Sequence, residues 1–194
     1  MRPRRVLLGA AILSVATGMA AASSVVGLSI EDQARLSQLI VVGEVVSQRG
    51  VDHPINGIET EVGLRVTHVL KGDARPGQLV LFHTRGGQLD GVISQAVGEA
   101  SFQTGKRSLV FIESVDGRLY NLGLSMGVWN VTEDGKGRPI FTRALQEGLE
   151  VIGDMSIENG PISLADMATR VVWAQRHPQF DHQMLRENLG NGGR

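Results

Sequence analysis

Hydrophobic and polar residues alternate most regularly in ETEVGLRVTHVLKG, residues 59–72. The two sets of alternate positions are Thr60, Val62, Leu64 and Val66 on one face and Glu61, Gly63, Arg65 and Thr67 on the other. Successive side chains of a β-strand point to opposite faces of a sheet, so this alternation predicts a half-buried strand. The turn-forming residues KGDARPG lead into a second apolar segment, QLVLFHTR, and so short a connection predicts an antiparallel hairpin.

Other apolar segments of strand length lie on both sides of this hairpin. LIVVGEVVSQ precedes it at residues 39–48, and Gly43 in its middle predicts a bulge or a sharp bend. After it, SLVFIE and RLYNLGL are joined by SVDG, whose Asp-Gly pair is a strong hairpin signal. VWNV and PIFTR can pair in the same way across TEDGKGR. At least six short strands at hairpin spacing predict a closed or nearly closed antiparallel barrel.

The hydrophobic period changes to that of a helix after the barrel. SLADMATRVVWAQRHP places apolar residues at helical spacing, with Ser163 as the predicted N-cap and Pro178 as the residue that ends the helix. Asp166 and Arg170 lie one turn apart and are expected to pair on the polar side of this helix. The last residues, 181–194, are expected to form either a short helix or a flexible tail.

The start of the chain has the order of a secretory signal peptide. The basic segment MRPRR is followed by an apolar segment that is too short for a comfortable membrane span. Ala20 and Ala22 then supply the small-x-small pattern that a signal peptidase accepts, so we expect cleavage after Ala22. We expect no membrane span after this point, and therefore a secreted or periplasmic protein.

These predictions divide the chain into five parts. They are a signal peptide at 1–22, a lead-in segment at 23–38, a β-barrel at 39–145, a linker with a helix packed on the barrel at 146–180, and the short helix or tail at 181–194. In the lead-in segment, Ser29 can cap a short helix, and Asp32 three residues later completes an approximate capping box.

Charge and cysteine content exclude several classes of partner and cofactor. Loss of residues 1–22 lowers the count of Lys and Arg from 19 to 16 against 20 Asp and Glu, so the mature chain carries about −4. A weakly acidic domain does not favour nucleic acid or anionic membranes as partners. The chain has no Cys, which excludes thiol catalysis, Cys-ligated zinc and iron–sulfur clusters.

The segment ASFQTGKRS, which begins at Ala100, resembles a phosphate-binding loop only superficially. Such a loop has Gly where this chain has Ala100, and it has Ser or Thr directly after Lys, where this chain has Arg107. The loop also opens a helix, whereas SLVFIE is a predicted strand. We therefore expect no nucleotide and no other cofactor.

Two histidines and one aspartate are the candidate metal ligands. If the first hairpin is centred near residues 75 and 76, His68 and His83 lie opposite each other on neighbouring strands. Such a pair can begin a metal site, with Asp90 as the candidate third ligand. The alternative interpretation is that both histidines are half-exposed polar residues on one face of the sheet.

Aromatic residues give a third candidate site. Trp129, Trp173 and Tyr120 would form a platform for carbohydrate if they were exposed on a concave face. The alternative for each tryptophan is packing in the core.

Taken in order, several of these segments resemble a group of bacterial secreted proteins with a domain like the netrin-like barrel of tissue inhibitors of metalloproteinases. The segments are LIVVGEVVSQ, LRVTHVLKGD, GEASFQTGKRSLVFI and YNLGLSMGVWNV, within residues 39–131. The resemblance implies a mainly β fold: a small antiparallel barrel of the oligonucleotide/oligosaccharide-binding (OB) type, with one or two C-terminal helices. It also implies that Phe102 packs under the barrel and that Gly105 turns the chain. The resemblance does not imply protease inhibition, because those inhibitors chelate the protease zinc through an N-terminal Cys and this chain has no Cys.

We therefore expect a secreted, non-catalytic β-barrel module that binds another protein or a cell-envelope component. No catalytic set of residues is recognisable, so the chain is not expected to be an enzyme. The alternatives are a metal- or carboxylate-dependent hydrolase on the same barrel and a carbohydrate-binding module.

Overall fold

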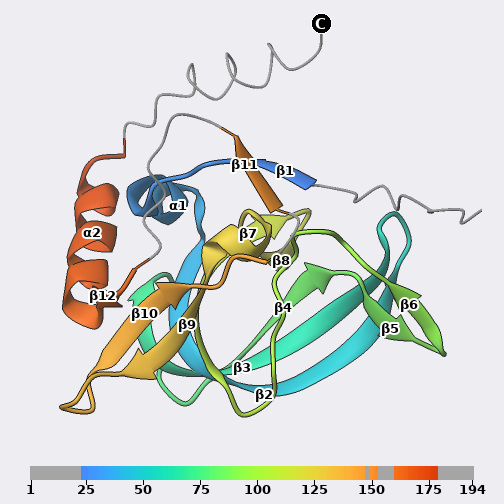
Figure 1. The fold of residues 1–194 in the computed structure, drawn as a ribbon, viewed down its shortest axis with the longest axis horizontal. Helices are drawn as coiled ribbons and strands as arrows, with labels where there is room; N and C mark the ends of the chain where they lie inside the picture. The colour runs from blue at the N-terminus through green and yellow to red at the C-terminus, as the bar shows by residue number, and fades with distance from the viewer. Residues whose placement is uncertain (1–22, 147–148, 153–159, 179–194) are drawn as a thin grey trace, which may run out of the picture.

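The computed structural model describes residues 23–146, 149–152 and 160–178, and the fold is mainly β, as predicted (Figure 1). The first elements are β1 (Ser23–Val26), α1 (Ile30–Leu36), β2 (Leu39–His53), β3 (Gly57–Lys71), β4 (Leu79–Arg85), β5 (Gly87–Leu89) and β6 (Val92–Ser94). They are followed by β7 (Arg107–Val115), β8 (Arg118–Asn121), the 3₁₀ helix η1 (Leu124–Gly127), β9 (Val128–Glu133), β10 (Pro139–Arg143), β11 (Leu149–Ile152), β12 (Ile162–Ser163) and α2 (Leu164–Arg176). The signal peptide expected at 1–22 and the short helix or tail expected at 181–194 lie outside the described residues.

Five of these strands close into a ring (Figure 1). β2, β3 and β4 are consecutive antiparallel neighbours, β7 returns to the free side of β2, and β8 pairs with β7. A parallel pairing of His83 in β4 with Tyr120 in β8 completes the ring. Three hairpin-connected strands with the fourth beside the first form a Greek key, the connectivity of an OB-type barrel. The predicted fold class is confirmed.

Residues 39–43 of β2 and residues 109–112 of β7 are buried on both faces, which explains why these parts of the two strands are apolar without interruption. One face of each strand points into the barrel, where it meets the side chains of β3 and β4: Val41, Val110, Ile112, Val62, Leu64 and Phe82. The other face packs against β9, β10 and the helices: Ile40, Phe111, Trp129, Phe141, Met167 and Val171. The barrel therefore shares two of its strands with a second core. Phe102 lies in the first core, edge-on to Phe82 at 5.2 Å between ring centroids, as the resemblance implied.

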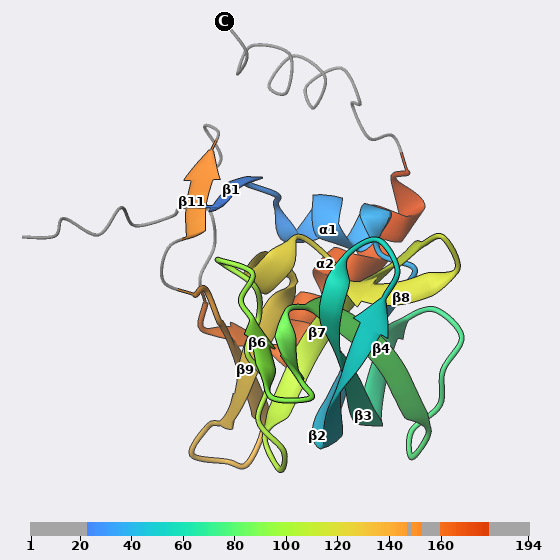
Figure 2. The same cartoon turned by 90° about the vertical axis from the view of Figure 1, so that its right-hand side faces the viewer.

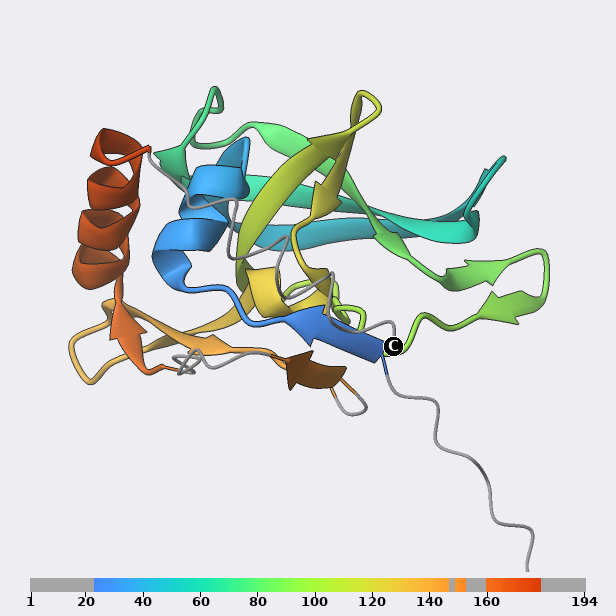
Figure 3. The ribbon, with the colours of Figure 1, turned by 90° about the horizontal axis from the view of Figure 1, so that it is seen from above.

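Both predicted helix caps are present. The backbone N–H of Asp32 donates to Ser29 Oγ at 3.1 Å, and that of Asp166 donates to Ser163 Oγ at 3.1 Å. In each case the Ser hydroxyl also donates to the Asp carboxylate, at 2.7 Å. The helices α1 and α2 pack on each other and cover the second core, at the opposite end of the molecule from the β2–β3 and β5–β6 hairpin tips (Figure 3).

Gly43 lies at the predicted irregularity in β2. The β2–β3 register shifts between Val42 and Gly43, and a Cβ at Gly43 would lie 2.5 Å from the backbone oxygen of Arg65. The chain can bend here because no side chain separates the two strands. Gly105, with φ +83°, turns the chain into β7 as the resemblance implied.

Two small sheets were not predicted. β5 and β6 form a hairpin inside the long Gly-rich connection, with its turn at Asp90 and Gly91, both in the left-handed region. β1 and β11 pair in parallel at the edge of the molecule (Figure 2). Within the described residues, no helix is long and apolar enough to cross a bilayer.

Candidate functional site

A pocket of about 520 Å³ opens where the β2–β3 turn, the end of β4 and the β7–β8 hairpin meet. We call it the barrel-end pocket. Its wall is rich in charged and polar residues: His53, Asn56, Arg85, Glu99, Glu113, Asp116, Arg118, Tyr120 and Asn121. Two exposed aliphatic residues, Ile55 and Val115, line it as well. A neighbouring pocket of about 490 Å³ shares Arg85 and Glu99 with it.

The buried carboxylate of Glu59 lies behind this wall and is fully inaccessible to solvent. Its Oε1 accepts hydrogen bonds from Tyr120 Oη at 2.9 Å and from Asn56 Nδ2 at 2.8 Å. Its Oε2 lies 3.2 Å from Arg118 Nη2, within ion-pair distance, although no described donor is directed at it with hydrogen-bond geometry. A buried charge requires such partners, so Glu59 fixes the β2–β3 turn to β8.

This environment raises the pKa of the Tyr120 phenol. Burial raises the pKa of the phenol above its ordinary value of 10.0, and the hydrogen bond to Glu59 and the negative charge of that carboxylate raise it further. The phenol therefore stays protonated and donates to Glu59.

Glu99 anchors the loop on the other side of the pocket. Its Oε1 accepts from Asn121 Nδ2 at 2.7 Å and from the backbone N–H of Ala100 at 2.9 Å. Its Oε2 accepts from the backbone N–H of Arg85 at 3.2 Å. Both oxygens are occupied, so this carboxylate is a fixed part of the wall.

Glu113 and Arg85 are charged groups of the wall whose side chains no other described residue holds. Within the part of the chain that the structure describes, neither side chain makes a hydrogen bond or an ion pair with another residue. Burial raises the pKa of the Glu113 carboxyl, and the positive charge of Arg85 opposes that shift. A half-buried carboxyl of this kind is suited to bind a cationic or hydrogen-bond-donating group.

The structure does not bring the candidate metal ligands together. β3 and β4 pair Arg65 with Leu79, so their hairpin is centred on residue 72 and His83 lies opposite Glu61. His68 instead lies opposite Val42 of β2, because β3 extends past β4 toward Lys71. The predicted pairing of His68 with His83 is therefore wrong.

The contacts of His83, His68 and Asp90 also place the three residues in different surroundings. His83 Nδ1 lies 3.3 Å from the backbone oxygen of Leu119, and its Nε2 lies 3.8 Å from Glu61 Oε2. His68 is exposed and contacts Thr67. Asp90 lies in the turn of the β5–β6 hairpin. Among the described residues, no three His, Cys, Asp or Glu side chains are grouped closely enough to hold a metal ion.

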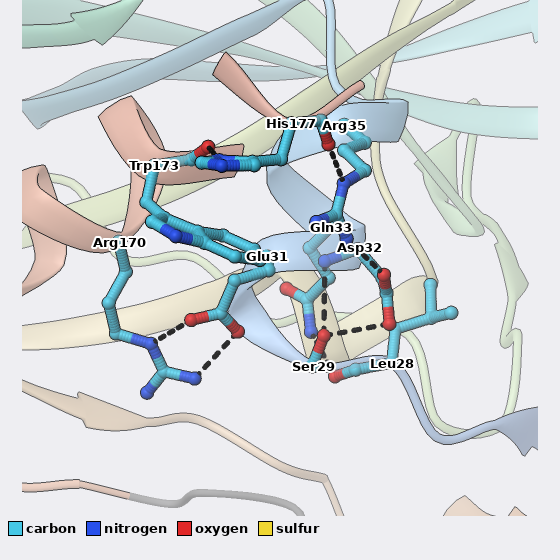
Figure 4. A network of polar contacts seen from close by, with 9 residues as sticks. All are labelled: Leu28, Ser29, Glu31, Asp32, Gln33, Arg35, Arg170, Trp173 and His177. Carbon is cyan, nitrogen blue, oxygen red and sulfur yellow. Dashed lines mark hydrogen bonds and ion pairs between the residues drawn. The ribbon is translucent and has the colours of Figure 1, made fainter. Parts of the chain in front are cut away.

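The candidate aromatic platform is not formed either. Trp129 is fully buried beneath the guanidinium of Arg143, whose Cζ lies 4.2 Å from the ring centroid, and Tyr120 is only 9% exposed. Trp173 is half exposed on α2, but the imidazole of His177 stacks on its ring at 4.4 Å between centroids (Figure 4). The three rings therefore do not share a concave surface.

Sequence reasoning missed the residues that build the barrel-end pocket. Glu59 occupies a polar position of the alternating strand, yet it is buried and accepts a hydrogen bond from Tyr120 of β8. One local signal was available: Asn56 and Gly57 form an Asn-Gly pair between two strands, and Gly57 has φ +73°. Such a pair predicts the hairpin turn at which the pocket begins.

Comparisons with known proteins do not place the chain in a family. The chain matches no family model, and a search of curated proteins gives no match.

Proposed function

We propose that this protein is an exported, non-catalytic binding module that docks onto another protein through the end of its barrel. The observation that carries the proposal is the exposure of large aliphatic side chains on hairpin tips. Ile55 in the β2–β3 turn is 86% exposed, and Val115 at the end of β7 is 45% exposed, with the barrel-end pocket between them. Turn tips are ordinarily polar, and grouped exposed apolar residues with polar neighbours are typical of protein interaction sites.

The β5–β6 hairpin extends this surface. Val92 and Ile93 are 59% and 68% exposed, and the hairpin projects at the same end of the molecule as the β2–β3 tip (Figure 3). Its base is fixed, because Thr60 Oγ1 donates to the backbone oxygen of Gly86 at 2.8 Å. A rigid scaffold that presents aliphatic tips loses little conformational entropy on binding a partner.

Export and the netrin-like resemblance belong to the same proposal. The basic and apolar segments before Ser23 support export, and the order of the sequence segments within residues 39–131 supports the resemblance. Mass spectrometry of the protein recovered from its source cells tests export, with a mature chain that begins at Ser23 as the expected result. Recovery of the chain with residues 1–22 attached would contradict it.

The docking surface is tested with variants of the mature protein immobilised on a resin. Secreted and envelope proteins of the source cells are passed over the wild type, the Ile55→Asp/Val115→Asp variant and a control, Val172→Asp, on the exposed side of α2. We expect one discrete protein to bind the wild type and the control, and to bind the barrel-end variant at least about tenfold more weakly. Loss of binding in the control alone, or retention of polysaccharide without protein, would contradict the proposal.

A further inference from the structure

The turn between β2 and β3 contains a pair of residues that is prone to a spontaneous chemical change. Asn56 is followed by Gly57, and both residues are exposed at the tip of the hairpin. The side-chain amide of an asparagine reacts with the backbone nitrogen of the next residue, and a side chain on that residue hinders the reaction. Gly57 has no side chain, and the space beside it is open, because a Cβ at this position would have no atom within 4 Å. The nucleophile of the reaction is therefore unhindered.

From this geometry we infer that Asn56 is a site of spontaneous deamidation. The backbone nitrogen of Gly57 loses its proton to solvent and attacks Cγ of Asn56, and the bond between Cγ and Nδ2 breaks. The leaving nitrogen takes up a proton from water and departs as ammonia, so that a cyclic imide remains. Water then opens the imide at either carbonyl, which gives aspartate or isoaspartate at position 56. No cofactor or partner takes part, so the inference does not depend on the proposed function.

The amide that would be lost also holds the turn to the barrel. Asn56 Nδ2 donates to Oε1 of Glu59 at 2.8 Å, and Glu59 is fully buried. An ionised carboxylate at position 56 has no proton to donate, and it repels the carboxylate of Glu59. Of the two hydrogen bonds that Oε1 accepts, the one from Tyr120 would remain. Deamidation would therefore detach the tip of the hairpin from Glu59 and add a negative charge beside the exposed Ile55.

The other asparagines of the described chain lack this combination. Asn121 is buried and precedes Leu. Asn130 is exposed, like Asn56, but it lies within β9 and precedes a β-branched Val. Asn130 is therefore a control that matches the exposure of Asn56 without the unhindered neighbour. Asn159 and Asn191 also precede Gly, and both lie outside the described residues.

Peptide mapping by mass spectrometry tests the inference. The purified protein is incubated in mildly alkaline buffer in its folded state and, in parallel, unfolded in urea. We expect the folded protein to convert Asn56 to a mixture of aspartate and isoaspartate, at least about tenfold faster than it converts Asn130, a ratio that a modest difference in activation free energy produces.

Three results would overturn the inference. The first is conversion of Asn56 and Asn130 at equal rates. The second is an intact Asn56 in the folded protein at a time when the unfolded protein has converted it, because the fold would then prevent the reaction. The third is aspartate without isoaspartate, because direct hydrolysis of the side-chain amide gives aspartate alone.

A variant tests the attack by the nitrogen of Gly57. Asn56→Gln keeps an exposed amide at the tip, but its cyclic imide requires a larger ring. We therefore expect this variant to stay unmodified at position 56 under the same conditions. Conversion at the wild-type rate would contradict the cyclisation.

The structural consequence is tested with Asn56→Asp, which has the charge of the aspartate product. Hydrogen exchange of the backbone amides in the β2–β3 turn should become about tenfold faster, because a hydrogen bond to a charged group is lost. Asn130→Asp adds the same charge on β9 and should leave exchange in the turn unchanged. If Asn56→Asp does not fold, the same measurement is made on deamidated wild type. Unchanged exchange in the turn would refute the predicted detachment.

Discussion

Arg170 in α2 forms two hydrogen bonds to the carboxylate of Glu31 in α1, across 139 residues of sequence (Figure 4). Nε lies 2.5 Å from Oε1, and Nη2 lies 2.7 Å from Oε2. The predicted partner, Asp166, instead accepts a hydrogen bond from the hydroxyl of Ser163 at the start of α2. The pair therefore joins the two helices rather than two turns of one helix.

Breaking this pair should weaken the packing of the helices. Arg170→Gln is expected to lower the free energy of unfolding by about 1–2 kcal/mol, because the pair is bidentate and partly buried. The control is Arg138→Gln, which removes the pair of Asp134 with a guanidinium that is 70% exposed and should cost less than about 0.5 kcal/mol. Urea unfolding followed by circular dichroism measures both. Equal losses in the two variants would contradict the assigned role.

The same pair predicts a pH dependence of stability. The hydrogen bond from Arg170 outweighs the opposing effect of burial and holds the pKa of Glu31 below its ordinary value of 4.5 in the folded protein. A lowered folded-state pKa means that the ionised carboxylate stabilises the fold above pH 4.5, and that this contribution disappears as the pH falls through the lowered pKa. The difference in unfolding free energy between wild type and Glu31→Gln should therefore be constant near neutral pH and shrink in acid. A difference that grows on acidification would refute this explanation.

Tyr120 allows a direct measurement at the barrel end, because it is the only tyrosine of the chain. Its absorbance change near 295 nm should give a titration midpoint above 10.0, since burial and Glu59 disfavour the phenolate. Glu59→Gln should lower that midpoint, whereas Glu61→Gln, which changes a carboxylate without contact to Tyr120, should leave it nearly unchanged. An ordinary midpoint in the wild type would show that the phenol does not donate to a buried carboxylate.

Gly50 provides a test of how the β5–β6 hairpin is held. A Cβ at this position would lie 1.9 Å from the backbone oxygen of Gln88 in β5, so Gly50→Ala should displace the hairpin. We expect a loss of about 1–3 kcal/mol and faster amide hydrogen exchange in β5 and β6. Gly135→Ala is the control, because no atom lies within 4 Å of its added Cβ. Unchanged exchange in the hairpin of Gly50→Ala would contradict the packing described.

The strands and helix caps could be predicted because the signals for them lie in residues that are close together in the sequence. Apolar runs such as the one around Val41 and alternation such as that around Leu64 follow from the two-residue period of a strand, and the caps at Ser29 and Ser163 follow from the chemistry of a single turn. Residues 39–43 of β2 and 109–112 of β7 are apolar without interruption because both of their faces are buried. An uninterrupted apolar segment does not reveal which face packs in which core.

The site was less predictable because it depends on register and ring closure. A shift in the centre of one hairpin from residues 75–76 to residue 72 moved His83 away from His68 and opposite Glu61. The environment of Glu59 depends on β8, whose Tyr120 is 61 residues away in sequence. Contacts of this range follow from the closed barrel and leave no periodic signal in the sequence.

Site-specific photo-cross-linking tests the central claim most directly, which is that the barrel end is a surface for a protein partner. A photoreactive residue is placed at position 55 in one variant and at position 172, at the helix-covered end, in another. Each full-length variant is expressed in the source cells and irradiated. The account predicts a defined protein adduct at position 55, competed by excess unmodified protein, and none at position 172. Adducts of equal intensity at both positions, or an adduct at position 172 alone, would contradict it.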